Sequence, residues 1–506
     1  MHPDTIHRQR WWTLGVLSLA LLVIGLDNTI LNVALPSVRA DLDATSGQLQ
    51  WIVDSYLLVF AGLLLTAGSL GDRFGRKRAL LTGLVIFGVG SAGSALAGSA
   101  DALIGTRALM GIGAAFIMPS TLSILTNVFP PAERPRAIAI WAAVSGLGIA
   151  LGPVSGGYLL EHFSWGSVFL VNVPFVLAAI LAAVRLVPES SDPETPPLDL
   201  VGAGLSIVGL TSLVWGLIEA SARGWTDPVI LTSFASAALL AVAFVAHELR
   251  TTHPMLDVRM FSNPRFSGAS GSIALVFFAL MGTIFFLTQY LQLVLGYSPL
   301  EAGIRVIPVA VGLIVGAGLS TRLTVLLGTK VVVAGGLTTL AGALLLLSTA
   351  ETTSGYGLVG TVLVLMGLGM GSAMAPATEA VMGSLPPEKA SVGSAMNDTT
   401  RMVGGALGVA VLGGVLGSHY RSHVDVTGLD GPAAEAARDS LGGALQMAAG
   451  NDAVLASAQQ AFVGGMTTAT LAAAAVAFAG ALFAAVVLPS RERSPGGALV
   501  GVPEPV

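Results

Sequence analysis

Long runs of apolar residues, separated by short polar segments, recur along most of the chain. Each run holds about twenty residues, which is enough for an α-helix to cross the ~30 Å hydrocarbon core of a bilayer. Alternating segments of about ten residues, which are typical of a membrane barrel, do not occur. The pattern predicts an all-α integral membrane protein with fourteen transmembrane helices, at 12–35, 51–70, 79–99, 102–128, 136–160, 167–187, 200–219, 228–248, 268–295, 301–327, 330–350, 356–384, 393–417 and 459–488.

The composition agrees with a membrane protein and excludes several kinds of chemistry. Hydrophobic residues make up 54% of the 506 residues and charged residues 10%, whereas soluble domains carry about 25% charged residues. The sequence has no cysteine, which excludes a disulfide framework, a thiolate nucleophile and a cysteine metal site. The first apolar run begins at Trp11 and lacks a small-residue cleavage site, so it predicts a retained span rather than a signal peptide.

The positions of the positive charges predict the orientation. When the N-terminus is placed in the cytoplasm, most of the 24 lysine and arginine residues fall in inside segments, as the positive-inside rule requires. Outside segments hold Arg39, Arg223, Arg421 and Arg438. We therefore expect both termini to be cytoplasmic, and we interpret the long external segment at about 418–457 as a partly helical, solvated cap. Arginine far outnumbers lysine, which suggests the inner membrane of a high-GC bacterium.

Two stretches recur in the second half of the chain, in the same order and at nearly the same offset. MGIGAAFIMPST at 110–121 returns as MGLGMGSAMAPAT at 366–378, and PPAER at 130–134 returns as PPEKA at 386–390. Duplicated halves are typical of transporters, whose substrate site lies between the halves near the middle of the membrane. The expected domains are an N-terminal six-helix bundle at 1–190, a two-helix insertion at 191–255, a C-terminal six-helix bundle at 256–490 and a cytoplasmic tail at 491–506.

Asp27 and Arg107 are charged residues inside predicted spans. A charge near the bilayer centre costs roughly 2.5–3.5 kcal/mol, so it needs a partner, a wet cavity or a function. Asn28 and Asn32 form a polar stripe next to Asp27 on the same helix. We expect Asp27 to exchange a proton or to meet a cationic substrate, with Arg107 tuning it from a neighbouring helix. A polar cluster that serves only packing is the alternative.

Asp398 and Arg401 lie three residues apart in a span of the second half, on one helix face. They are expected either to line the central cavity, Asp398 in proton coupling and Arg401 in substrate binding, or to neutralise each other as a structural pair. Asp54 lies one turn inside the external boundary and is either a substrate contact or an interfacial residue. The other expected substrate contacts offer polar or apolar surface: Asn32, Met110, Gln289 and Tyr290.

The stretch GSLGDRFGRKR at 68–78 concentrates charge between two apolar runs. Its positive charges would keep a short loop in the cytoplasm, but orientation needs neither Asp72 nor the glycines, which permit a tight turn and close helix contact. We expect Asp72 to cap the following helix or to pair with a basic residue across the loop. The residues expected to switch conformation here are Gly68, Gly71, Asp72, Arg73, Gly75 and Arg76.

A second glycine-rich stretch, GLGIALGPVSGG at 146–157, places small residues at every fourth position around a proline. Such spacing lets helices approach closely, and proline bends a span. We expect this helix to slide or rock against the other half, although the same spacing also serves static packing. The residues concerned are Gly148, Gly152, Pro153 and Gly156.

The motifs of soluble catalysis are missing. The sequence contains no G-x-x-x-x-G-K-[ST] phosphate loop, no H-E-x-x-H motif and no metal-spaced cluster of His and Asp. We therefore expect no enzymatic activity, no cofactor, no metal and no nucleic-acid partner, and we do not expect ATP to supply the energy.

Taken together, the motifs resemble the major facilitator superfamily, specifically its fourteen-span drug:proton antiporter family. The 68–78 stretch is similar to the superfamily signature between helices 2 and 3, and LDNTILNVALP at 26–36 to the family's helix 1 signature. Arg107 with Gly111 is similar to the helix 4 motif linked to proton transfer, and 146–157 to the helix 5 motif of antiporters.

This resemblance implies the major facilitator fold, with two six-helix bundles and two inserted helices. It further implies export of a hydrophobic, often cationic, drug or antibiotic against inward proton flow, by a functional monomer that uses the 68–78 stretch as a latch between its halves. Proton-coupled uptake and a membrane receptor without transport are the alternatives.

Overall fold

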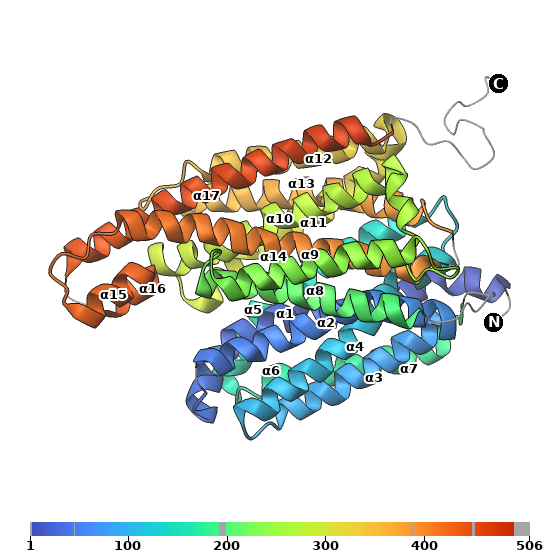
Figure 1. Ribbon diagram of the computed structural model, residues 1–506, viewed down its shortest axis with the longest axis horizontal. Helices are drawn as coiled ribbons and strands as arrows, with labels where there is room; N and C mark the ends of the chain where they lie inside the picture. Colours follow the sequence, from blue (N-terminus) through green and yellow to red (C-terminus); the bar gives the residue numbers. More distant parts are fainter. Residues whose placement is uncertain (1–2, 45, 192–198, 387–388, 448–450, 490–506) are drawn as a thin grey trace.

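The computed structural model describes residues 3–44, 46–191, 199–386, 389–447 and 451–489, and the predicted tail at 491–506 lies outside them. Within these residues all regular secondary structure is helical (Figure 1). The elements are α1 (Pro3–Leu42), α2 (Ser46–Phe74), α3 (Arg76–Ala95), α4 (Ala100–Val128), α5 (Arg134–His162), α6 (Ser167–Leu170), α7 (Asn172–Leu186), α8 (Leu200–Arg223), α9 (Pro228–Glu248), η1 (Val258–Ser262), α10 (Pro264–Gln289), η2 (Tyr290–Val294), α11 (Pro299–Leu327), α12 (Thr329–Leu347), α13 (Tyr356–Met382), α14 (Ala390–His423), α15 (Gly431–Asp439), α16 (Leu441–Met447) and α17 (Asp452–Val487).

The helices have the length and composition expected of membrane spans. Thirteen helical segments among the described residues are long and apolar enough to cross a bilayer, with α6 and α7 forming one of them. The remaining predicted span falls on α5, a helix of 29 residues in the same bundle. Helix α1 begins and α17 ends at the same end of the molecule, as an even number of spans requires (Figure 1). The prediction of an all-helical membrane protein is confirmed.

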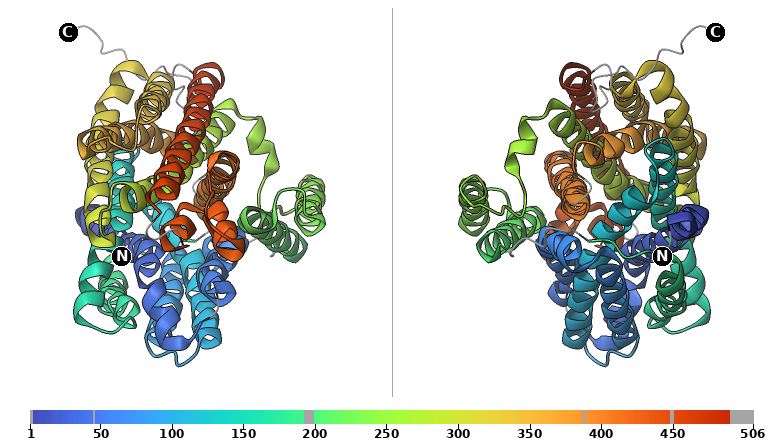
Figure 2. Two further views of the ribbon diagram at one scale, coloured as in Figure 1. Left: turned by 90° about the vertical axis from the view of Figure 1, so that its left-hand side faces the viewer. Right: turned by 90° about the vertical axis from the view of Figure 1, so that its right-hand side faces the viewer.

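Two bundles, one from each half of the chain, pack side by side (Figure 2). Helices α1 to α7 form the first bundle, and α10 to α14 with α17 form the second. Helices α8 and α9 stand at one side as a hairpin, where α8 contacts α2 and α14. The bundles meet where α5 packs against α11 and α13, and where α2 and α4 pack against α14. This is the major facilitator arrangement with an inserted helix pair.

The repeated sequence motif has the same packing role in both bundles. A Cβ atom on Gly111 of α4 would lie 2.6 Å from the carbonyl oxygen of Tyr56 in α2. A Cβ atom on its counterpart in the repeat, Gly367 of α13, would overlap the carbonyl oxygen of Val309 in α11. A larger residue at either position would force the two helices apart. The internal repeat therefore reflects a duplicated pair of closely packed helices.

The helices extend beyond the predicted span boundaries, which shortens two predicted loops. The loop expected at 71–78, between the predicted spans 51–70 and 79–99, is reduced to Gly75, where α2 ends and α3 begins. The external segment expected over 418–457 is shorter because α14 continues to His423 and α17 begins at Asp452. Polar residues continue these helices outside the hydrocarbon core, where hydropathy no longer marks the boundary.

Candidate functional site

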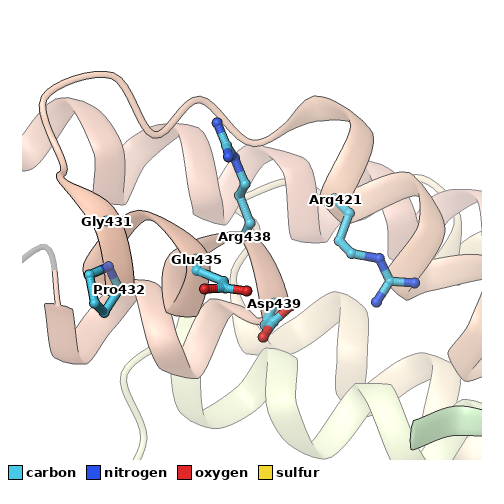
Figure 3. A pocket seen from close by; sticks show the side chains of 6 residues that line it. All are labelled: Arg421, Gly431, Pro432, Glu435, Arg438 and Asp439. Carbon is cyan, nitrogen blue, oxygen red and sulfur yellow. The ribbon is translucent and has the colours of Figure 1, made fainter. Parts of the chain in front are cut away.

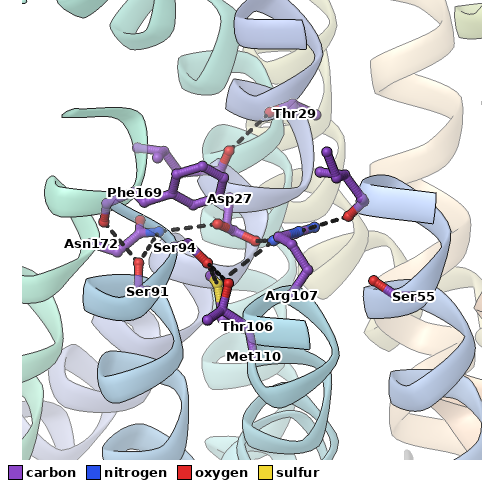
Figure 4. A network of polar contacts seen from close by, with 12 residues as sticks. Asp27, Thr29, Ser55, Ser91, Ser94, Thr106, Arg107, Met110, Phe169 and Asn172 are labelled. Atoms are coloured by element: carbon purple, nitrogen blue, oxygen red, sulfur yellow. Dashed lines mark hydrogen bonds and ion pairs between the residues drawn. The ribbon is translucent and has the colours of Figure 1, made fainter. Parts of the chain in front are cut away.

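An ion pair between Asp27 of α1 and Arg107 of α4 lies buried inside the first bundle (Figure 4). Nη1 of Arg107 donates to Oδ2 of Asp27 at 2.6 Å, and the two side chains are 2% and 0% exposed. Arg107 also donates from Nε to the carbonyl oxygen of Ile52 at 3.1 Å, and its guanidinium lies 4.3 Å from the centre of the Tyr56 ring. The pairing predicted from the sequence is confirmed, whereas its part in proton transfer stays a prediction.

Asn172 of α7 completes this site. Its side-chain amide donates to Oδ1 of Asp27 at 3.1 Å and to the hydroxyl of Ser91 at 3.2 Å, and Ser91 donates to the carbonyl oxygen of Phe169 at 2.8 Å (Figure 4). Both carboxylate oxygens of Asp27 are therefore occupied. Asn172 was not among the predicted residues, although a single amide within the apolar run LVNVPF is a signal that could have indicated it.

The glycine stripe of α5 packs against α1, the helix that carries Asp27. A Cβ atom on Gly148 would lie 3.1 Å from the Cα atom of Gly25, and one on Gly152 would overlap the side chain of Thr29. Gly156, one turn further, faces Ile30 of α1. These contacts lie within one bundle, because small residues let α1 and α5 approach each other there.

The stripe itself therefore faces α1, whereas α5 meets the second bundle through another side, and sliding of this helix against the other half stays a prediction. The side of α5 that meets the second bundle carries Gly146 and Gly157, whose Cβ atoms would contact Leu313 and Leu300 of α11. The side chain of Pro153 lies outside the described residues.

Asp72, in the last turn of α2, joins the two bundles. Its carboxylate accepts hydrogen bonds from the backbone N–H of Ser391, at 3.0 and 3.1 Å, and from that of Val392, at 3.1 Å, in the first turn of α14. A helix N-terminus has free N–H groups and a partial positive charge, so it favours a carboxylate. Arg76 donates to the same carboxylate from Nε at 2.9 Å and from Nη2 at 2.8 Å.

One of the two roles expected of Asp72 is confirmed and the other is wrong. The pair with a basic residue forms with Arg76. The following helix, α3, has no side-chain cap, because α2 continues past Asp72 and only Gly75 separates the two helices. The carboxylate instead caps α14, which lies in the other half of the chain.

Glycines shape this contact between the bundles. A Cβ atom on Gly68 would lie 2.8 Å from the carbonyl oxygen of Ser391, and one on Gly71 would lie 3.5 Å from the Ser391 hydroxyl. Gly75 has a φ angle of +112°, which favours glycine. Arg73 is half-buried and lies over the ring of the neighbouring phenylalanine at 5.3 Å.

The second charged pair, Asp398 and Arg401 of α14, is buried as well but is held less closely. Nη1 of Arg401 lies 3.8 Å from Oδ1 of Asp398, and the side chains are 6% and 1% exposed. The guanidinium lies over the ring of Trp141 in α5 at 4.7 Å and near that of Phe277 in α10 at 5.5 Å. Arg401 thus contacts both bundles, and the predicted helix-face pair is present. Its functional role stays a prediction.

Asp54 and Met110 are the two other predicted substrate contacts of the first bundle whose side chains the structure describes. Asp54 is half-buried on α2. Met110 is fully buried, with its sulfur 3.9 Å from Nη1 of Arg107 and 3.6 Å from the hydroxyl of Ser94 in α3. The structure therefore brings Met110 to the Asp27 site rather than to the second bundle. The side chain of Asn32 lies outside the described residues.

Gln289 and Tyr290 lie at the junction of α10 and η2. The hydroxyl of Tyr290 donates to the carbonyl oxygen of Glu351 at 2.7 Å, and the ring is buried. The amide of Gln289 donates to the carbonyl oxygen of Phe285, in its own helix, at 3.3 Å. Tyr290 therefore fixes the segment between α12 and α13, and a substrate contact at either residue stays a prediction.

A pocket of about 580 Å³ lies in the segment between α14 and α17, near the end of α14 and along α15 (Figure 3). None of the predicted site residues lines it. Among the described residues, no group of three or more His, Asp or Glu side chains is placed to hold a metal. The lining residues are Arg421, Gly431, Pro432, Glu435, Arg438 and Asp439.

Comparison with known proteins places this geometry in a family. The model of the Major Facilitator Superfamily matches residues 17–409. The chain is 39% identical over 479 residues to the multidrug efflux pump LfrA of Mycolicibacterium smegmatis, covering 93% of this chain and 95% of that protein. It is 37% identical to the tetracenomycin C resistance and export protein of Streptomyces glaucescens, covering 81% and 76%. It is 34% identical to the methyl viologen resistance protein SmvA of Salmonella typhimurium, covering 90% and 93%.

Solved structures of transporters have the same fold. The human organic anion transporter MFSD10 superposes with a TM-score of 0.63 at 16% identity, covering 94% of this chain and 99% of that one. The proton:xylose symporter XylE superposes with a TM-score of 0.62 at 16% identity, covering 95% and 96%. At this identity the likeness shows the fold alone.

Proposed function

The chain belongs to the Major Facilitator Superfamily, and from this premise we propose that it exports hydrophobic, often cationic, compounds in exchange for protons by alternating access. Its similarity to multidrug efflux and antibiotic resistance proteins extends over most of its length, which supports a drug exporter. Proton coupling and the cationic character of the substrate are supported by the charges inside the bundles.

The buried pair of Asp27 and Arg107 is the observation that carries the proposal. Protonation of Asp27 would remove the charge that balances Arg107, and an unpaired buried cation is strongly unfavourable. A protonated Asp27 is therefore expected to favour a different arrangement of α1 and α4 from the one with the closed 2.6 Å pair. Proton binding and helix movement are coupled through this pair.

The contact between Asp72 and α14 supports the alternating-access part of the proposal. It joins the bundles at one end of α2 through a few hydrogen bonds. When the bundles separate there, water can replace the carboxylate at the helix N-terminus, so the net cost of opening is small. A contact of this kind can form and break in each transport cycle.

The membrane potential supplies enough energy for such a pump. A potential of 100 mV provides about 2.3 kcal/mol for each charge moved, which corresponds to a roughly fortyfold concentration gradient. Exchange of one proton for a neutral compound moves one net charge and is driven by this potential. Exchange of one proton for a singly charged cation is electroneutral and is driven by the pH difference instead, and neither exchange needs ATP or a cofactor. We place the protein as a monomer in the inner membrane of a bacterium, with both termini in the cytoplasm and with substrate, protons and lipid as its partners.

Transport by the purified protein in proteoliposomes tests this function. A pH gradient is imposed, ethidium movement is followed by fluorescence, and internal pH is followed with pyranine. We expect ethidium to move against its gradient only while the proton gradient persists, and a protonophore to stop it. Ethidium movement that does not depend on the proton gradient, or that runs in the same direction as the protons, contradicts antiport. A susceptibility panel in an efflux-deficient host then identifies the natural class of compound.

A further inference from the structure

Two carboxylates are buried next to arginines inside the bundles, and only one of them has its oxygens occupied. Asp27 accepts a hydrogen bond from Arg107 at 2.6 Å and another from Asn172 at 3.1 Å. Asp398 is 1% exposed, yet both of its carboxylate oxygens lack a hydrogen-bond partner among the described residues. Nη1 of Arg401 stands 3.8 Å from it, which balances its charge without forming a hydrogen bond.

The polar atoms around Asp398 lack partners too. Ser394, Asn397, Asp398 and Arg401 are spaced so that they share one face of α14. The hydroxyl of Ser394, both amide atoms of Asn397 and Nε of Arg401 are buried without a hydrogen-bond partner. Burying a polar group without a partner is unfavourable, and native proteins rarely leave several such groups together. The face is therefore built to bind a group that the chain itself does not supply.

Arg401 is held in place by residues other than Asp398. Its guanidinium lies 4.7 Å from the centre of the Trp141 ring, and Nη2 donates to the hydroxyl of Thr378 at 3.4 Å. Trp141 is itself fixed by donating from Nε1 to the hydroxyl of Thr121 at 3.1 Å. The attraction between an arginine and the face of an aromatic ring is strongest where both are removed from water. Arg401 can therefore remain in place while the oxygens of Asp398 bind another group.

We propose that Asp398 accepts the cationic group of the transported compound. The positive charge of Arg401 competes with that group for the carboxylate and so sets the affinity for cations. The inference rests on the proposed export function and assigns a substrate group to a residue within it. An ammonium or other cationic donor binds the open carboxylate oxygens, and the like charge of Arg401 weakens that binding. Because a proton needs the same oxygens, substrate and proton exclude each other at Asp398.

Asp27 does not fit this role. A substrate there would first have to displace Arg107 and Asn172 from the carboxylate. Breaking a buried, hydrogen-bonded pair is strongly unfavourable, whereas both carboxylate oxygens of Asp398 are without a hydrogen-bond partner among the described residues. The two carboxylates therefore have different roles. Asp398 binds the cation, and Asp27 couples protonation to helix movement.

Two aromatic probes of different charge test the inference. Binding of tetraphenylphosphonium, a permanent cation, and of N-phenyl-1-naphthylamine, a neutral aromatic amine, is measured on purified protein in detergent, and efflux of both in proteoliposomes. Asp398→Asn is expected to weaken cation binding at least tenfold and to leave the neutral probe within twofold. Arg401→Gln is expected to strengthen cation binding about fivefold, because a like charge is removed from the site.

Two further variants distinguish a change in binding caused by charge from one caused by misfolding. Arg401→Lys keeps the positive charge and is expected to leave cation affinity within about twofold, whether or not Arg401→Gln folds well. Arg223→Gln is the matched control, since Arg223 forms an exposed pair with Glu219 at 2.7 Å on the side hairpin; it is expected to change neither probe. The elution profile of each variant checks that it is folded.

The outcomes distinguish this inference from the proposed function. Equal losses of both probes in Asp398→Asn, weaker cation binding in Arg401→Gln, or wild-type protein that binds no tetraphenylphosphonium would each overturn it. Protein that binds tetraphenylphosphonium through Asp398 but does not move it under a proton gradient would contradict the export function and leave the inference standing.

Discussion

The carboxylate of Asp72 accepts a hydrogen bond from the backbone N–H of Ser391, a residue 319 positions later in the chain. This bond links the end of α2 to the first turn of α14 and so connects the two bundles. The positively charged stretch around Asp72 therefore contains more than an orientation signal. The one carboxylate in this stretch belongs to the first bundle and caps a helix of the second bundle.

Replacing Asp72 by Asn is expected to preserve membrane insertion and to lower turnover at least tenfold. The amide has the same shape but lacks the charge that favours a helix N-terminus and the neighbouring Arg76. Efflux rate is measured per amount of inserted protein, which is determined by immunoblotting of membranes. Asp41→Asn, at an exposed position of α1, is the control. A parallel loss of inserted protein and of efflux would return the stretch to the role of an orientation signal.

Replacing Asp27 by Asn is expected to abolish proton-coupled efflux and to destabilise the protein by about 3–5 kcal/mol, because Arg107 is left as an unpaired buried charge. The double variant Asp27→Asn with Arg107→Gln removes both charges, so it is expected to recover most of the stability and none of the coupling. Thermal unfolding in detergent and proton uptake in proteoliposomes measure the two effects. The assignment is wrong if the single variant transports substrate and protons at the wild-type rate.

Replacing Gly152 by Leu is expected to destabilise the first bundle by about 1–3 kcal/mol, as overpacking typically does. A side chain there would overlap Thr29 and push α5 away from α1. The melting temperature in detergent measures the effect. Gly342→Leu is the matched control, since a Cβ atom at this exposed position of α12 meets nothing within 4 Å. Equal melting temperatures for the two variants would show that the contact with α1 tolerates bulk.

The fold and the tertiary pair of Asp27 and Arg107 could be predicted from the sequence because the membrane limits the choices. An apolar run of sufficient length has to form a helix there. Charged residues inside such runs are few, so each has only a few candidate ionic partners. Arg107 has no acidic neighbour in the sequence, and Asp27 was therefore the expected tertiary partner, as the structure confirms.

Contacts between helices were harder to predict because packing leaves a weaker trace in the sequence. The spacing of Gly148 and Gly152 indicates a close contact but not which helix makes it, and the partner is α1 rather than the second bundle. Ser391 contributes backbone N–H groups to Asp72, and any residue other than proline offers one. Such a contact is visible only once the two bundles are placed together.

A disulfide between α2 and α14 is expected to lock the bundles together and to stop transport reversibly. A Cβ atom on Gly71 would lie 3.7 Å from the Cβ atom of Ser391, within the usual range for a disulfide of about 3.5–4.5 Å. The chain has no cysteine of its own, so the double variant Gly71→Cys with Ser391→Cys forms only this bond.

With a protease site inserted between the bundles, the two fragments of the cross-linked protein are expected to migrate together on a gel until a reductant is added. Efflux is expected to fall at least tenfold on oxidation and to return on reduction. The efflux rate of each single cysteine variant is expected to stay unchanged under both treatments. Full efflux from completely cross-linked protein would show that this contact never opens, and the bundles would then have to alternate in some other way.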